Sequence, residues 1–164
     1  MTAVALTAAL LGSGCGKTAL TGTAGKDIKV LPASTLPKTL SGLTVKPEKV
    51  TKALQQAKHS YVDAVGFYSL RQQKVVQGTI QISHFGPTAR IDSAAFRTKI
   101  VDAASPGKAA VVNVGGTTVS QSLGTKSIVT IWFSKGRMIV LTVLLSYPGA
   151  RGLLEQTLAA LPTK

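Results

Sequence analysis

The stretch SIVTIWFSKGRMIVLTVLLS, residues 127–146, decides the fold. Two runs of apolar and β-branched residues, 127–133 and 137–146, lie on either side of the short turn sequence Ser-Lys-Gly. Such runs predict two strands that pair as an antiparallel hairpin. Both runs are apolar at successive positions, so both faces need cover, from elements on the two sides or from a second layer. The sequence therefore predicts a buried hairpin at the centre of a sheet.

Four further strands precede this hairpin in the chain. Residues 63–70 and 74–85 are predicted to pair across Arg-Gln-Gln, and residues 109–114 and 117–122 across Gly115–Gly116. A Gly-Gly pair between two apolar runs is a strong signal for a two-residue hairpin turn.

The strand predicted at 74–85 alternates in polarity. Val76, Gly78, Ile80 and Ile82 share one face, and Gln77, Thr79, Gln81 and Ser83 share the other. This pattern predicts one buried face and one solvent-exposed face.

Three helices complete the predicted fold. The first, residues 47–61, begins with a proline, which suits a first helical turn, and has apolar residues at helical spacing. The second starts at Asp92 or Ser93 and ends at Ser-Pro-Gly, and the third, residues 150–162, has leucines along one face. The order of elements predicts an α+β fold: a single domain with an antiparallel sheet of about six strands and three helices packed on it.

The N-terminal stretch LLGSGCGKTAL, residues 10–20, fits two unrelated interpretations. Gly16, Lys17 and Thr18 match the end of a phosphate-binding loop. The first glycine of that motif would fall on Leu11, and the residues that follow are rich in Gly and Thr, which disfavours the helix that the motif requires. No acidic residue follows a buried run of the kind that supplies the Mg²⁺ ligand, so the sequence disfavours a nucleotide site.

Residues 1–15 instead resemble a bacterial lipoprotein signal. An apolar stretch too short to span a bilayer ends in small residues directly before Cys15, the only cysteine of the chain. In such signals the peptidase cuts before the cysteine, which carries the lipid. The preceding leucine stands one place early, at Leu11, and no Lys or Arg precedes Lys17, so the recorded start would lie inside a longer signal. The alternative is a buried N-terminal helix with a free thiol in the core.

The resemblance divides the chain into three parts. Residues 1–14 are expected to be the signal peptide, residues 15–38 a flexible tether that begins at the lipid-modified Cys15, and residues 39–164 the α+β domain. A short edge strand that ends at Pro32 is expected within the tether. The protein is then expected to be exported and held by its lipid at the extracytoplasmic face of the cell membrane.

The charge of the chain points to an anionic partner. Nineteen Lys and Arg against six Asp and Glu give a net charge of +13. Nucleic acid is disfavoured, because the basic residues form no run and only one Trp, three Tyr and four Phe are available for stacking on bases. Two interpretations stay open: a solvated basic surface, or a surface that binds anionic lipid or an acidic wall polymer of the cell envelope.

Few residues could carry catalysis. The only histidines are His59 and His84, and the G-x-S-x-G motif is absent. Asp63 and Asp92 could form a carboxylate pair in principle, but a turn acid and a helix cap explain them as well. We therefore expect no metal site and no cofactor, and a non-catalytic binding or accessory module. The alternative is a hydrolase of an envelope polymer with a site that the sequence does not reveal.

Four residues are candidates for ligand or partner contact. Tyr68, Arg71 and Gln73 fall at the end of the first predicted hairpin, where loops commonly carry function. Trp132 and Phe133 fall on opposite faces of a central strand, and Trp132 could form the wall of an apolar pocket that holds an acyl chain. The alternative for both aromatic residues is core packing.

Several short patterns together resemble a family. The stretches SYVDAVGFYSLRQ, GTIQISHF, FRTKIV, TIWFSKGRMIVLTV and RGLLEQTLAAL look like those of a set of uncharacterised exported proteins of actinobacteria, over residues 38–161. The order of elements is also similar to that of small PsbP-like and Mog1-like domains. The first resemblance implies export and a single folded unit, and the second a binding or assembly module, for which a protein partner is also conceivable. Neither supplies catalytic residues.

Overall fold

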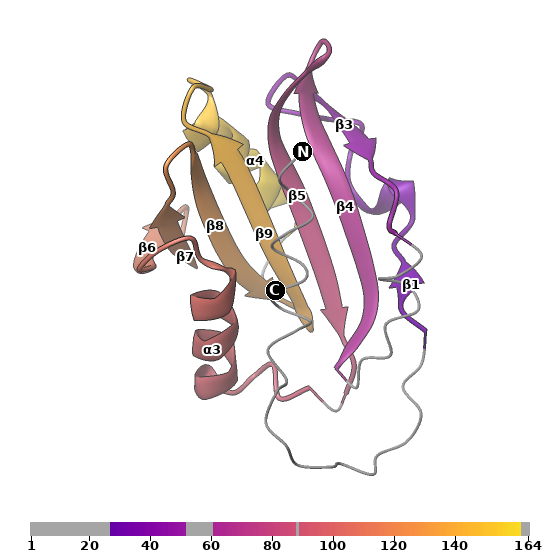
Figure 1. Cartoon of the computed structure of the whole chain (residues 1–164), viewed down its shortest axis with the longest axis vertical. Coiled ribbons are helices and arrows are strands. Elements are labelled where there is room, and N and C mark those ends of the chain that lie inside the picture. Colours follow the sequence, from indigo (N-terminus) through magenta and orange to yellow (C-terminus); the bar gives the residue numbers. More distant parts are fainter. Residues whose placement is uncertain (1–26, 52–60, 88, 162–164) are drawn as a thin grey trace.

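The computed structural model describes residues 27–51, 61–87 and 89–161. Within them the chain forms a nine-stranded sheet, two α-helices and one short 3-10 helix (Figure 1). The strand order across the sheet is β2-β3-β4-β5-β9-β8-β7-β6, and β1 pairs with β4 beside this path. All pairs are antiparallel except β1 with β4. The predicted α+β class with a mostly antiparallel sheet is confirmed.

The elements have the following bounds. The strands are β1 (Lys29–Val30), β2 (Thr39–Leu40), β3 (Leu43–Pro47), β4 (Val62–Gln72), β5 (Val75–Phe85), β6 (Ala110–Val114), β7 (Thr117–Leu123), β8 (Ser127–Ser134) and β9 (Arg137–Leu144). The helices are the 3-10 helix η1 (Ala33–Thr35), α3 (Ala94–Ala104) and α4 (Ala150–Ala160).

The hairpin β8–β9 lies inside the sheet, with β5 on one side and β7 on the other. Its turn is formed by Lys135 and Gly136 alone, both with positive φ, at 46° and 74°. A two-residue turn of this kind matches the right-handed twist of the two strands. The predicted central hairpin is therefore confirmed, with a turn one residue shorter than Ser-Lys-Gly.

The two faces of this hairpin are covered by different helices. On the first face, Leu153 and Leu154 of α4 belong to the same buried cluster as Trp132. On the second face, Val101 of α3 belongs to a cluster with Met138. Figure 1 shows α4 behind the sheet and α3 beside β8, at the end of the sheet where β8 finishes. Cover from both sides explains why both strands are apolar at successive positions.

The structure has more strands and fewer described helices than predicted. Of the short strands β1, β2 and β3, only the edge strand that ends near Pro32 was expected. The hairpin β2–β3 turns at Ser41–Gly42, both with positive φ. The predicted helix 47–61 is not helical as far as residue 51, because Pro47 ends β3 and pairs with Tyr68. Residues 52–60 of that helix lie outside the described residues.

The predicted solvent-exposed face of β5 is wrong at two positions. Gln81 and Ser83 are buried, with 8% and 5% of their surface exposed. In the register, Gln81 stands between Phe67 and Val140, so large apolar neighbours flank it on both sides. Its amide donates a hydrogen bond of 3.4 Å to the Ser83 hydroxyl. Two polar side chains that hydrogen-bond to each other can be buried at a low cost in free energy. The alternation of polar and apolar residues in this strand therefore does not predict which residues are exposed.

The predicted tether ends earlier than residue 38. Ile28 and Leu36 are buried, and Lys29–Val30 pairs with β4. Residues 27–38 are therefore part of the folded unit, because their apolar side chains fill space beside the sheet. The predicted signal peptide 1–14, Cys15 and the rest of the tether lie outside the described residues. Within the described ranges, no helix is long and apolar enough to cross a membrane.

Candidate functional site

The four predicted contact residues do not form one patch. Tyr68 and Trp132 are each 1% exposed and belong to the core cluster on the first face. The Tyr68 hydroxyl donates a hydrogen bond to the Pro32 carbonyl at 3.1 Å, so the ring anchors the N-terminal segment to β4. Gln73 is exposed in the β4–β5 turn, where its φ is 55°. Arg71, on the second face of β4, belongs to a different cluster.

Arg71 of β4 forms an ion pair with Glu48, the residue that follows β3. The distance from Arg71 Nη2 to Glu48 Oε1 is 2.9 Å. Ser69 lies between the two residues: its hydroxyl donates to Glu48 Oε1 at 2.6 Å and accepts from Arg71 Nε at 2.8 Å. The hydrogen bond from Ser69, together with Arg71 and Lys46, holds the pKa of Glu48 below its ordinary value. A carboxylate with a lowered pKa stays ionised at neutral pH, which suits an ion pair rather than a proton donor.

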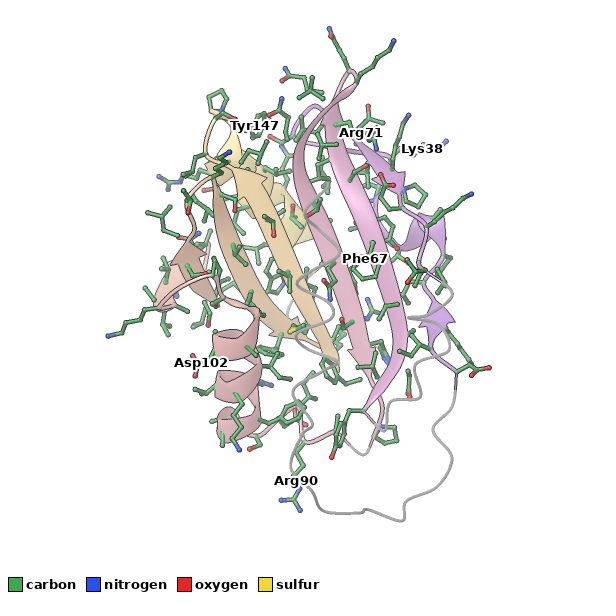
Figure 2. All side chains as sticks on the ribbon, viewed as in Figure 1. Lys38, Phe67, Arg71, Arg90, Asp102 and Tyr147 are labelled. Carbon is green, nitrogen blue, oxygen red and sulfur yellow. The ribbon has the colours of Figure 1, made fainter. Side chains whose placement is uncertain are left out.

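The described lysines are all exposed, and no ion pair is formed by any of them within the described residues. The nine described lysines are Lys29, Lys38, Lys46, Lys49, Lys74, Lys99, Lys108, Lys126 and Lys135, and we call them the basic surface. Within the described residues, the three ion pairs all use arginine, and no lysine takes part in one. Figure 2 shows Lys38 and Arg71 toward one end of the sheet and Arg90 at the opposite end.

A hollow lies at the end of the sheet where β8 turns into β9. Its volume is about 400 Å³. Three segments surround it: the loop before α3 with the first turn of α3, the β6–β7 turn, and the β8–β9 turn. We call it the end hollow, and the side chains that matter below are Asp92, Arg97, Thr118, Phe133 and Lys135.

Arg97 is held firmly at this hollow. Its Nε donates to the Ile91 carbonyl at 2.5 Å, and its guanidinium carbon lies 5.1 Å from the centre of the Phe133 ring. A guanidinium over an aromatic face is attracted by the ring quadrupole, which adds to the positioning. The contact from Nη2 to Asp92 Oδ1 is long, at 3.4 Å, and the side chain of Asp92 is fully exposed. This ion pair is therefore weak.

The residues considered for catalysis lie on separate segments. Asp63 is at the start of β4, close to Gly86, whereas Asp92 is in the loop before α3. His84 is partly buried on the first face, with Ala64 and Arg137 as its neighbours in the register. In the part of the chain that the structure describes, no three His, Cys, Asp or Glu residues gather closely enough to hold a metal ion.

Sequence reasoning missed Arg97 and Lys135. The Lys-Gly dipeptide predicts a turn but not its position at a hollow, and Arg97 stands in no basic run or motif that would mark it. The stacking of Arg97 on Phe133 joins positions far apart in the chain, so no local pattern could have indicated it.

The comparisons with known proteins add no further constraint. No family model, curated protein or solved structure matches the chain. The function is therefore argued from the geometry of the described residues.

Proposed function

We propose that this protein is an exported, lipid-anchored, non-catalytic binding module of the bacterial cell envelope, whose basic surface holds anionic groups. The observation that supports this function is that, within the described residues, nine lysines are present and none forms an ion pair. The described residues contain fourteen Lys and Arg against six Asp and Glu. Such an excess opposes folding through self-repulsion, but it attracts polyanions over distances of about 10 Å at 0.1 M salt.

The proposed location rests on the N-terminal sequence. A short apolar stretch that ends in Gly-Ser-Gly-Cys has the form of a lipoprotein signal, and Cys15 is the only cysteine. A lipid on Cys15 would place the domain beside anionic headgroups and wall polymers.

The Cys15→Ser chain tests the proposed lipid anchor first and the proposed basic surface second. After expression in a bacterial host, the wild-type chain should enter the detergent phase on phase partitioning, and Cys15→Ser should stay in the aqueous phase with an unchanged melting temperature. If the wild-type chain stayed in the aqueous phase, the proposal of a lipid anchor would be wrong. A lower melting temperature for Cys15→Ser would instead indicate a core thiol.

The same Cys15→Ser chain tests the basic surface without the lipid. It should sediment with phosphatidylglycerol vesicles and not with phosphatidylcholine vesicles. Binding should weaken as salt rises from about 50 to about 500 mM, because the screening length falls from above 10 Å to a few Å. Equal binding to both kinds of vesicle, or to neither, would contradict the proposed function.

A further inference from the structure

We propose that the end hollow is a binding site for a phosphate group carried by an envelope ligand. This assignment rests on the proposed function, because it names the place at which one anionic group is held specifically. The volume of about 400 Å³ lies within the range of small-molecule sites and has room for a phosphate with an attached polyol or sugar.

The first donor is the guanidinium of Arg97. Its Nε is bonded to the Ile91 carbonyl and its Nη2 makes one long contact with Asp92. Most of its five N–H donors therefore have no acceptor in the described part of the chain. The carbonyl bond and the stacking on Phe133 fix the group before a ligand arrives, so little side-chain freedom is lost on binding.

The second donor is the ammonium of Lys135, which is placed at the hollow by an unfavourable backbone conformation. Lys135 has φ of 46°, at the first position of a two-residue turn where Asn, Asp or Gly is preferred. A left-handed lysine is less stable there than glycine or asparagine. A strained residue at the rim of a hollow is a reason to look for function, and here the strained residue is an exposed cation that forms no ion pair within the described ranges.

One hydroxyl completes the donor set. Thr118, the second residue of β7, lines the hollow on the face of Phe133, and its hydroxyl makes no hydrogen bond within the described residues. Thr117 shares the opposite face with the buried Val119, because side chains alternate along a strand. The donors thus come from three separate segments around the hollow rather than from one plane. Such an arrangement fits a tetrahedral oxyanion better than a flat carboxylate, for which a single bidentate arginine would suffice.

Asp92 is the internal competitor of the ligand. Its carboxylate is fully exposed and lies 3.4 Å from Arg97 Nη2, where it partly neutralises the site. A phosphate that binds Arg97 must displace this contact. Removal of the Asp92 charge should therefore tighten binding, whereas a site with no anionic ligand would not respond in this way.

The experiment is calorimetric titration of the Cys15→Ser chain with sn-glycerol 3-phosphate, with glycerol as the uncharged control. Lys135→Asn should weaken binding about tenfold, the loss expected for one hydrogen bond to a charged group. The same change should raise the melting temperature by about 2–4 °C, because asparagine tolerates the left-handed turn. Asp92→Asn should tighten binding about threefold, as expected when a weak exposed ion pair is removed.

The matched control is Lys74→Gln, which removes one exposed lysine from the β4–β5 turn, away from the hollow. Its affinity should equal that of the parent chain. Equal affinities for the parent, Lys135→Asn and Asp92→Asn would overturn the site, as would binding of glycerol itself. A gain in stability for Lys135→Asn with no loss of affinity would also overturn it.

A second readout separates this site from the basic surface and identifies the source of the phosphate. Lys135→Asn should keep most of its binding to phosphatidylglycerol vesicles, since eight other described lysines remain. If the parent chain bound glycerol phosphate but not the vesicles, the proposed function would be contradicted and the phosphate site would still be supported. If soluble poly(glycerol phosphate) competes with glycerol 3-phosphate for the hollow and vesicles do not, the phosphate belongs to a polymer. If the vesicles compete and the polymer does not, the phosphate belongs to a lipid headgroup.

Discussion

Among the described residues, Trp132 is the largest fully buried side chain, and its indole N–H has no hydrogen-bond partner there. The residue is 1% exposed, and Nε1 makes no hydrogen bond in the described structure. A buried donor without an acceptor lowers the stability of the folded state by about 1–3 kcal/mol. Burial of the ring therefore stabilises the core, and the unpaired N–H reduces that stabilisation.

Substitutions at Trp132 should separate the two effects. Trp132→Ala should lower the free energy of unfolding by about 3–5 kcal/mol, through lost burial and a cavity. Trp132→Phe should stay within about 1 kcal/mol of the wild type, because removal of the unpaired N–H offsets the smaller ring. Urea unfolding measures both. A loss for Trp132→Phe as large as for Trp132→Ala would mean that the nitrogen is satisfied by a bound water.

Glu48 should give a small pH dependence to stability. Its pKa is lowered in the folded state, first by the Ser69 hydroxyl and then by Arg71, so folding favours the ionised form. The stabilisation is fully present above the unfolded pKa, about 4.3, and is lost as pH falls through the lower folded value. The carboxylate is half exposed, so the effect should stay below about 1 kcal/mol.

The test is an NMR titration of the Glu48 side-chain carboxyl. In Ser69→Ala the pKa should rise toward the ordinary glutamate value, because the strongest cause of the shift is removed. Arg71→Met should also raise the pKa, because both the hydrogen bond and the charge of Arg71 favour the ionised carboxylate. An unchanged pKa in Ser69→Ala would show that another group holds the carboxylate ionised.

At the scale of elements, α4 is the helix that fastens the first face of the sheet to the N-terminal hairpin. Leu153 is fully buried against the sheet, and the Gln156 side chain accepts a hydrogen bond of 2.5 Å from the backbone N–H of Ser41. Tyr147, just before the helix, donates to the Ser41 carbonyl at 3.2 Å. The backbone N–H and C=O of Ser41, in the β2–β3 turn, are thus both hydrogen-bonded to the C-terminal segment.

This arrangement predicts a large difference between two leucines. Leu153→Ala should lower the free energy of unfolding by about 2–5 kcal/mol, the range for a buried leucine. Leu123→Ala, at the end of β7, is the matched control: this leucine is 68% exposed, and its loss should cost less than about 0.5 kcal/mol. Chemical denaturation measures both. Equal losses would mean that α4 does not pack as described.

At the scale of the whole molecule, the excess positive charge should make stability rise with salt. The net charge is +13, and only three exposed or half-exposed ion pairs offset it within the described ranges. Screening weakens the repulsion among many lysines more than it weakens three such pairs. The melting temperature of the Cys15→Ser chain should therefore increase between about 20 and about 300 mM sodium chloride. A decrease would show that attraction outweighs repulsion in the folded state.

Local patterns in the sequence were sufficient for the main elements. The hairpin at Gly115–Gly116, the central hairpin, and helices α3 and α4 were all predictable, because turn residues and apolar periodicity act within a few positions. The placement of Trp132 and Phe133 on opposite faces followed from the alternation of a strand in the same way. Short strands such as β2 carry too few residues to show any period.

Only the tertiary structure decided which polar residues are buried and which charges meet. Gln81 and Ser83 lie in a polar pattern yet are buried, because neighbouring strands place large apolar side chains beside them. Glu48 meets Arg71 across two strands, and Arg97 meets Phe133 across a helix and a sheet. Exposure and ion pairing depend on what packs against a residue. Those neighbours come from distant parts of the chain, so local sequence determines the elements, and the sites arise only when the elements are assembled.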